Sequence, residues 1–320
     1  MITTVLKQKI LIAVLAAREN FTGSDAKFAI SIGVNNAQYS RIKNGDFEKV
    51  LSDPAWITLA RKFNVSISNA PAWNIAKTAV FQSITAQMEV CQQQCISTML
   101  CDVADAGKTV AAKYYASTHK NVVYIDCSQV KSKQKFIRQI AKSFGVDSNG
   151  RYADVYEDLV FYLKTLSTPL IILDEAGDLN YDAFLEIKAL WNAVEMICSF
   201  YMIGADGLRE KVRRAINNKK VGYAEIFRRF GNKYVSIVPS GEVKSQFMNS
   251  EAMLIIKANA PEGANLKQIL NRIKGEDQLP SLTRIRTELA KLTPQASPLP
   301  LSQGEGKERE TNVYNDKEVG

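Results

Sequence analysis

Several features that define other classes of protein are missing from this 320-residue sequence. No apolar run approaches the roughly 20 residues that a helix needs to span a bilayer. The apolar stretch from Val5 to Ala17 is interrupted by Lys7 and Lys9 and has no convincing cleavage site after it. We therefore expect no signal peptide, no membrane contact and a cytoplasmic location.

Histidine and paired cysteines are also scarce. His119 is the single histidine, and the five cysteines form no C-x-x-C pair. Cys91 and Cys95 lie one helical turn apart, which is a conceivable ligand spacing, but no second pair completes a metal site. The cysteines are instead expected to be buried or free thiols in a reducing cytosol.

Basic residues are abundant. The 41 lysines and arginines exceed the 33 aspartates and glutamates, which gives a formal net charge of +8. Such a balance favours a polyanionic partner, and nucleic acid is the first candidate. The length allows two or three domains with a substantial core.

A phosphate-binding motif organises the middle of the chain. Gly107-Lys108-Thr109 follows an apolar run, precedes a helical segment and matches the second half of G-x-x-x-x-G-K-[ST]. In such a loop, backbone N–H groups surround nucleotide phosphates, the lysine reaches the β- and γ-phosphates, and the hydroxyl binds Mg²⁺. Asp102 replaces the opening glycine, and its carboxylate costs affinity unless it faces away. The residues expected at the nucleotide are Asp102, Ala104, Asp105, Ala106, Gly107, Lys108, Thr109 and Val110.

A second motif lies downstream, where the apolar run from Pro169 to Leu173 ends in Asp174 and Glu175. Such a run suits the centre of a parallel sheet, and ligands bind at the carboxyl end of its strands. Asp174 is predicted to hold Mg²⁺ and Glu175 to polarise the attacking water. Either motif alone has an ordinary structural explanation, but the two in this order predict a P-loop ATPase that uses ATP and Mg²⁺.

Residues 1–68 are predicted to form a small all-helical domain. Ser24 opens a capped helix that ends at Gly33, and Asn36 starts a second, polar-fronted helix after a short turn. This is the helix-turn-helix pattern of DNA-binding proteins. The side chains expected to face a major groove are Asn35, Asn36, Gln38, Tyr39, Arg41 and Lys43. The alternative is a helical bundle with a solvated polar face.

Strands and helices alternate from residue 69 to 240, which predicts an α/β fold with a parallel sheet between helices. The expected strands span residues 96–100, 121–126, 169–173, 199–204 and 234–238. A linker from Val65 to Trp73 is expected before this domain. Residues 241–292 are expected to form a helical lid, and the polar residues 293–320 a disordered tail.

These motifs, in this order, resemble AAA+ ATPases. With the N-terminal helices included, nearly the whole chain is similar to the B transposition protein family of phage Mu and Mu-like elements. The most specific segments are Gly107-Lys108-Thr109, Leu170 to Ala176, and Ile226 to Phe230. The resemblance implies an ATPase in the bacterial host that binds double-stranded DNA with little sequence preference when loaded with ATP. It also implies helical filaments of the protein that deliver target DNA to a transposase and stimulate it.

The resemblance assigns further residues. Arg229 matches the arginine that one subunit supplies to its neighbour's γ-phosphate, with Arg228 as the second choice. Ala205 stands where a polar sensor is usual, so Asp206 either substitutes or the role is absent. Lys267 is the expected lid sensor. Together with Asp102, these departures imply slow or conditional hydrolysis, with ATP acting as an assembly switch.

Two basic clusters are candidates for DNA binding. The first is Lys131, Lys133 and Lys135, and its alternative is a solvated lysine face. The second consists of Arg209, Lys211, Arg213 and Arg214, for which a subunit contact or a solvated helix is the alternative. Each phosphate contact that a mutation removes is expected to flatten the log–log salt dependence of binding by about 0.9.

Two other functions stay open at the level of sequence. One is a nucleotide-switched regulator or replication-initiation helper that binds one DNA site through residues 20–46. The other is a structural filament subunit that no longer hydrolyses ATP, for which Asp102 and Ala205 are the motive.

Overall fold

The computed structural model describes residues 2–63, 65 and 73–292. Its centre is a parallel sheet of four strands in the order β1-β4-β3-β2. The strands are β1 (Thr98–Cys101), β2 (Val122–Asp126), β3 (Leu170–Asp174) and β4 (Ser199–Gly204). Thr98 pairs with Tyr201, and Leu170 pairs with both Val122 and Ser199, so all four carboxyl ends lie at one edge of the sheet. The predicted α/β fold is confirmed.

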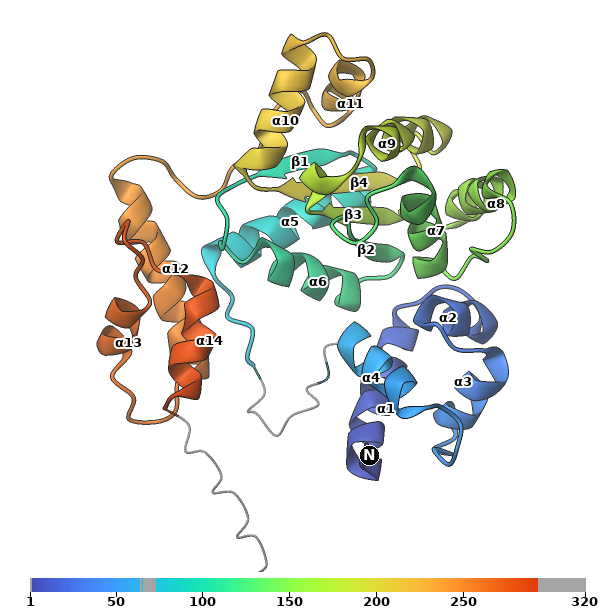
Figure 1. Cartoon of the computed structure of the whole chain (residues 1–320), viewed down its shortest axis with the longest axis horizontal. Helices are drawn as coiled ribbons and strands as arrows, with labels where there is room; N and C mark the ends of the chain where they lie inside the picture. The colour runs from blue at the N-terminus through green and yellow to red at the C-terminus, as the bar shows by residue number, and fades with distance from the viewer. Residues whose placement is uncertain (1, 64, 66–72, 293–320) are drawn as a thin grey trace, which may run out of the picture.

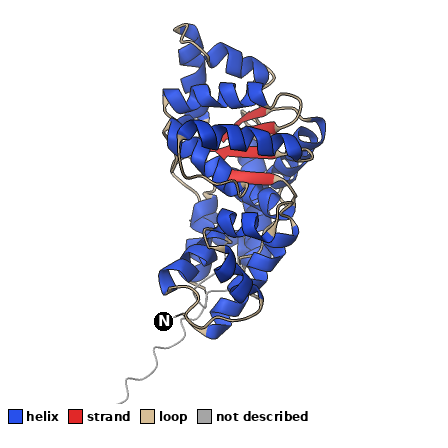
Figure 2. Cartoon of the chain, turned by 90° about the vertical axis from the view of Figure 1, so that its right-hand side faces the viewer, coloured by secondary structure: helices blue, strands red, loops and turns tan. Residues whose placement is uncertain are grey.

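Helices cover both faces of this sheet (Figures 1 and 2). Successive residues of a strand point to opposite faces of the sheet. Accordingly, Met99 and Cys101 belong to the hydrophobic core on one face and Leu100 to the core on the other. The helices that flank the sheet are α5 (Ala79–Gln94), α6 (Lys108–Thr118), α7 (Lys133–Ser143), α8 (Tyr152–Thr165), α9 (Tyr181–Ala193), α10 (Asp206–Asn217) and α11 (Tyr223–Arg229). A short 3₁₀ helix, η1 (Ala176–Asp178), follows β3.

The fifth strand predicted at residues 234–238 is wrong. This segment makes a single bridge between Val235 and Leu100, so it lies beside β1 without forming a strand. The N–H groups of Ile237 and Val238 donate to the Asp102 carboxylate instead of to a neighbouring strand. The side chain of Asp102 therefore ends the ladder that the apolar pattern predicted.

The N-terminal helices have their own core. They are α1 (Thr4–Glu19), α2 (Asp25–Ile32), α3 (Asn36–Lys43) and α4 (Asp53–Lys62). The helix ends follow local signals: Ser24 caps α2, Gly33 ends it at φ +81°, and Asn35 with Gln38 forms a capping box on α3. Trp56 and Phe28 are buried in the core of this bundle.

The N-terminal bundle contacts the sheet domain on the side of α6, α7 and α8 (Figure 1). Lys27 Nζ lies 3.9 Å from the centre of the Tyr162 ring, and Asn20 donates to the Ser117 carbonyl over 3.1 Å. The carbonyl of Lys27 also lies so close to Gly145 that a Cβ there would clash with it.

Three further helices, α12 (Val243–Asn259), α13 (Leu266–Arg272) and α14 (Leu282–Ala290), form a third body with a core around Ile256 and Ile285. Buried Glu251 on α12 accepts hydrogen bonds from the N–H groups of Ala79 and Val80 and so caps α5. No helix of the described residues is both long and apolar enough to cross a membrane. Most of the predicted linker and the whole predicted tail lie outside the described residues.

Candidate nucleotide site

The loop from β1 to α6 has the backbone of a phosphate-binding turn. Gly107 has φ +86° and precedes α6, which has no side-chain cap of its own. Asp105 also has a positive φ, of +57°. An uncapped helix end with a glycine before it leaves N–H groups and the positive end of the helix dipole available to an anion.

Lys108 lies inside this loop. Its side chain is buried, and its ammonium donates to the carbonyls of Asp102 and Val103, at 3.0 and 2.5 Å. Burial lowers the pKa of Lys108, while the charges of Asp102, Asp174 and Glu175 act in the opposite direction. The lysine is therefore held among backbone oxygens at the position where the motif predicts it.

Thr109 and Asp174, which are 65 residues apart in the sequence, meet at the edge of the sheet. The Thr109 hydroxyl donates to Asp174 Oδ2 over 2.7 Å, and the Tyr124 hydroxyl donates to the same oxygen over 2.8 Å. Burial and the Asp174 carboxylate raise the pKa of Tyr124, which keeps its hydroxyl a donor. A hydroxyl and a carboxylate side by side are hard oxygen ligands of the kind Mg²⁺ prefers.

Tyr124 is a site residue that the motifs missed. Its signal in the sequence is a hydroxyl-bearing residue within the apolar strand that precedes Asp126. Because β2 pairs in register with β3, that strand lies directly beside the one that carries Asp174.

Glu175 follows Asp174 with a left-handed backbone, φ +51°, and its side chain is exposed. Loss of part of its hydration nevertheless raises the pKa of Glu175, and the neighbouring Asp174 charge adds to this rise. The turn after it is held from α10, because the Lys211 ammonium donates to the carbonyls of Gly177 and Leu179 over 2.7 and 2.5 Å. The carboxylate thus stands beside the predicted metal ligands on a braced turn.

The Asp102 carboxylate is bound by backbone N–H groups of the loop and of the segment after β4. This buried carboxylate accepts from the N–H of Val103 over 2.8 Å and from those of Ile237 and Val238. The carboxylate is therefore held by three backbone N–H groups, while its negative charge still acts on Lys108.

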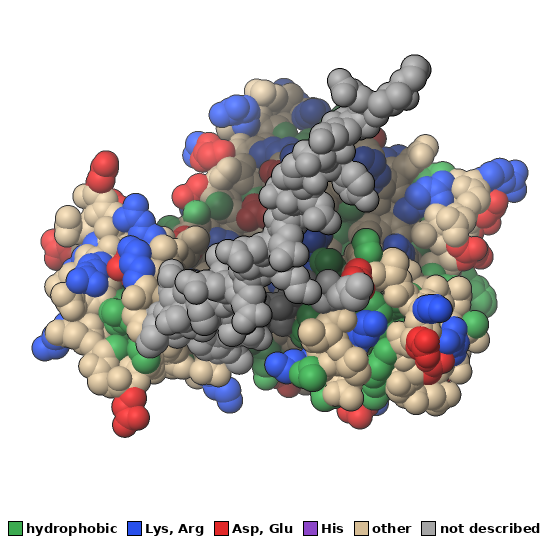
Figure 3. Space-filling view, turned by 60° about the horizontal axis from the view of Figure 1, so that its bottom comes forward, with side chains coloured by type: hydrophobic (Ala, Val, Ile, Leu, Met, Phe, Trp, Pro, Cys, Tyr) green, Lys and Arg blue, Asp and Glu red, His purple; other side chains and the backbone are tan. Residues whose placement is uncertain are grey.

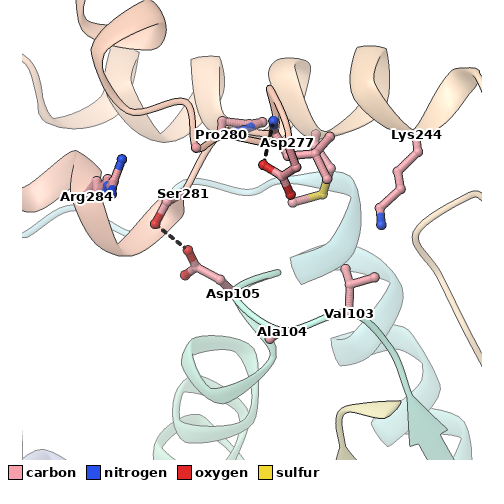
Figure 4. Close-up of a pocket in the computed structure, with 11 residues that line it drawn as sticks. Val103, Ala104, Asp105, Lys244, Asp277, Pro280, Ser281 and Arg284 are labelled. Carbon is pink, nitrogen blue, oxygen red and sulfur yellow. Dashed lines mark hydrogen bonds between the residues drawn. The ribbon is translucent and has the colours of Figure 1, made fainter.

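A cavity of about 410 Å³ lies between the loop and the lid helices (Figure 4). The loop contributes Val103, Ala104 and Asp105, and the lid contributes Lys244, Met248, Pro280, Ser281 and Arg284, among others. Lys267, the predicted lid sensor, is exposed on α13 and does not line this cavity. The lid cations that line it are Lys244 and Arg284, and neither was singled out from the sequence.

Asp206 lies at the first position of α10, exposed, with an ion pair to Arg209 over 3.8 Å. Its charge is close enough to help raise the pKa of Lys108 against the effect of burial. Arg209 donates to the carbonyl of Cys101 at the end of β1, over 2.8 Å. Asp206 is therefore near the phosphate loop, on the element that leaves β4.

The two candidate arginines of α11 have different surroundings. Arg229 donates to Asn192 Oδ1 over 2.6 Å and lies 5.0 Å from the centre of the Trp191 ring. Arg228 is exposed and makes no side-chain hydrogen bond or ion pair with any residue that the structure describes. Figure 1 places α11 and the lid on different sides of the sheet, so neither arginine lies at the cavity of its own chain.

The three candidate lysines after β2 are not equivalent. Lys131 pairs with Asp178 over 3.1 Å, and Lys133 pairs with the nearly buried Glu186 over 2.9 Å. Lys135 is exposed and lines a polar hollow of about 290 Å³ together with Lys131 and Asn180. In the second basic cluster, Arg209 and Lys211 donate to backbone carbonyls, Arg213 pairs with Glu210, and Arg214 is exposed.

On α3, the placement of Tyr39 in a groove-facing position is wrong. Tyr39 is 1% exposed and packs against Phe28, with the ring centres 5.3 Å apart, because it shares the inner face of the helix with Ile42. The other predicted residues lie at or near the surface: Asn36 is exposed, Gln38 closes the capping box, Arg41 pairs with Asp46 and Lys43 pairs with Asp25.

The fold and this site define a P-loop protein with an AAA domain. Residues 92–212 match the family model described as AAA domain, and this range holds the phosphate loop, Asp174, Glu175 and the first part of α10. The predicted AAA-type fold is confirmed by this match.

The chain is also similar to the Mu-like prophage FluMu DNA transposition protein B of Haemophilus influenzae. The two are 22% identical over 259 residues, which cover 76% of this chain and 88% of that relative. This match confirms the resemblance to the B transposition proteins of Mu-like elements. Among solved structures, the chain is similar to the Aeropyrum pernix Orc1 protein in complex with DNA, with 13% identity and a TM-score of 0.43 over 68% of this chain and 66% of that one.

Proposed function

We propose that this chain is an ATP-dependent DNA-binding ATPase that forms filaments on DNA, delivers target DNA to a transposase and stimulates it. The observation that carries the nucleotide part is the contact between Thr109 and Asp174 beside Lys108 and Glu175. The name of the relative, a DNA transposition protein, supports the choice of partner.

Each residue of the site has a separate part in this proposal. The N–H groups at the start of α6 and the Lys108 ammonium bind the phosphates of ATP. Thr109 and Asp174 would hold Mg²⁺, which would supply positive charge to the phosphate oxygens. Glu175, whose exposed carboxylate follows Asp174 at the edge of the sheet, orients the attacking water and accepts its proton.

Two cations complete the site from outside the loop. Arg284 is the lid cation assigned to the γ-phosphate, in place of the expected Lys267, because it lines the cavity between the loop and the lid and Lys267 does not. Arg228 acts across a subunit interface in preference to Arg229, since Arg229 is engaged by Asn192. A cation supplied in this way requires an oligomer, which agrees with a filament.

DNA is bound through separated basic groups. On the face shown in Figure 3, basic side chains are spread over several elements among acidic ones, so no single patch there accounts for the net charge. Lys135 and Lys131 are the first candidates, because they share one hollow and Lys135 has no acidic partner in the described part of the chain. Asn36, Gln38, Arg41 and Lys43 on α3 are the second.

A second function is favoured by one feature. The sharply capped pair of α2 and α3 with an exposed polar face suits a regulator that reads one DNA site. In that case bound nucleotide would control whether the chain binds DNA, and hydrolysis would not drive that binding.

The test is binding of the purified chain to random-sequence duplex DNA at fixed salt, with ATP, with ADP and without nucleotide. We expect cooperative binding that needs ATP, is abolished in Lys108→Ala and lasts longer in Glu175→Gln. Binding that ignores nucleotide would contradict the proposal. Binding that concentrates on one sequence would favour the regulator. Release of phosphate, measured with and without DNA, tests hydrolysis itself.

A further inference from the structure

Asp105 has a left-handed backbone conformation, which aspartate adopts more readily than most residues other than glycine. Its φ of +57° lies in the left-handed region, which glycine enters without penalty and which residues with a Cβ generally avoid. Asp105 lies inside the phosphate loop, between the end of β1 at Cys101 and the glycine that precedes α6. An anionic side chain so close to the expected phosphates needs a physical reason.

The carboxylate of Asp105 is bound to the lid. It accepts hydrogen bonds from the hydroxyl of Ser281 (Figure 4) and from that of Thr283, both over 2.8 Å, and from the N–H of Thr283 over 3.1 Å. The two partners are 176 and 178 positions away along the chain. The phosphate loop and the lid are therefore joined through this one side chain.

These bonds replace a missing helix cap. Ser281 is the N-cap residue of α14, but its side chain makes no cap hydrogen bond to the helix. Asp105 instead supplies the acceptor for the N–H of Thr283 in the first turn, where a carboxylate also faces the positive end of the helix dipole. The phosphate loop therefore caps a lid helix.

Arg284 directly follows Thr283 and lines the cavity between the loop and the lid. In the described structure its guanidinium donates to the carbonyl of Lys274 over 3.3 Å, so it stays on the lid side of that cavity. The rest of α14 is held by Ile285 and Leu289 in the lid core. Asp105 is thus the link that joins the first turn of α14 to the loop.

We propose that Asp105 is a positioning residue: it ties α14 to the phosphate loop and thereby sets the distance from Arg284 to the γ-phosphate. This inference rests on the proposed ATPase function. Asp105 acts through Arg284 and does not itself touch the reacting atoms.

The substitution Asp105→Gly separates the backbone conformation of this residue from its hydrogen bonds to α14. Glycine keeps the left-handed conformation but has no carboxylate to accept from Ser281 and Thr283. We expect ATP affinity, measured by calorimetry, within about threefold of the wild-type value, since the loop is free of strain. We expect kcat to fall by about fivefold to tenfold, because Arg284 is no longer held at a fixed distance from the phosphate loop. Asp105→Asn keeps one acceptor oxygen and is expected to recover part of kcat.

Arg284→Met completes a double-mutant cycle. If Asp105 acts through Arg284, the double variant turns over no more slowly than Arg284→Met alone. Arg272→Met is the matched control, because it removes an exposed lid cation of α13 that does not line the cavity, and it should leave kcat unchanged. Hydrogen exchange at the Thr283 amide gives a readout without catalysis: its protection should drop in Asp105→Gly while amides in α12 keep theirs.

Turnover by Asp105→Gly at the wild-type rate or above, a decrease that adds to that of Arg284→Met, or unchanged protection of Thr283 would each overturn the inference. A wild-type chain that binds ATP and DNA but hydrolyses no ATP would contradict the proposed ATPase instead. The exchange experiment still tests the link in that case.

Discussion

At the scale of single residues, the site is best understood through its aspartates. Asp174 accepts from Thr109 and Tyr124 at the predicted metal position, whereas Asp102 and Asp105 serve other segments of the chain. Asp102 replaces a glycine of the phosphate-binding pattern and bonds to backbone N–H groups at 237 and 238. Asp102, the residue that departs from the functional motif, therefore makes a structural contact.

This role predicts the effect of Asp102→Ala on stability. The substitution leaves the N–H of Val238 buried without its acceptor and frees that of Ile237, so the free energy of unfolding should fall by about 1–3 kcal/mol. Urea unfolding followed by circular dichroism measures this. Asp158→Ala, at an exposed position of α8, is the control and should change the value by less than about 0.5 kcal/mol. Equal stability of both variants would show that the contact contributes nothing.

At the scale of elements, α10 connects the strand end at β4 to the turn after β3. Lys211 is half-buried, and burial lowers its pKa, while both of its hydrogen bonds go to carbonyls of the turn that follows Glu175. Gly177 of that turn lies against the backbone of Leu208. Most of the basic residues of α10, which in the sequence resemble a DNA-binding patch, are thus used within the fold.

Lys211→Met should loosen the turn and so the orientation of Glu175. We expect kcat for ATP to fall by about tenfold, the equivalent of roughly 1.4 kcal/mol in the activation barrier, with ATP affinity nearly unchanged because the phosphate loop is untouched. Steady-state kinetics and calorimetry separate the two quantities. Arg214→Met, on the exposed side of the same helix, is the matched control for charge. A larger drop in DNA affinity in Lys211→Met than in Arg214→Met would favour the DNA-binding interpretation instead.

At the scale of the whole molecule, three parts with separate hydrophobic cores are in contact: the N-terminal bundle, the sheet domain and the lid. The N-terminal bundle contacts α7 and α8, and the lid contacts the phosphate loop through Asp105 and the start of α5 through Glu251. The surface charge is distributed over these bodies, so the proposed DNA binding would depend on which lysines are free of internal partners.

Substitutions of Lys135 and Lys133 test this dependence. Lys135→Ala should reduce the slope of log Kd against log salt by about 0.9, the value for one phosphate contact to B-DNA. Lys133→Ala should change the slope less, because its ammonium is held by Glu186, and should instead lower the melting temperature by leaving that nearly buried carboxylate unpaired. Titrations at several salt concentrations and thermal melts distinguish the two. The reverse pattern would exclude Lys135 as a DNA contact.

Much of this protein was predictable from the sequence, because the signals are local. Ser24, Gly33 and Asn36 lie at helix boundaries where capping chemistry places them. The Gly107-Lys108-Thr109 run and the apolar strand before Asp174 each consist of consecutive residues, and parallel pairing alone brings the ends of their strands to one edge. The fold class and the pairing of Thr109 with Asp174 follow from that.

Other features depend on contacts between residues that are far apart in the sequence, and only the folded structure reveals them. Asp102 and Asp105 find their partners 135 and 178 residues away, and no local pattern encodes a hydrogen bond over such a distance. The same holds for Arg284 at the cavity and for the segment at Val235, whose apolar alternation predicts a strand until a side chain takes its N–H partners. The burial of Tyr39 is different, because its spacing of three residues from Ile42 is a local signal that places both on the inner face of α3. Local periodicity determined the elements, and contacts between distant side chains determined which residues are free to act.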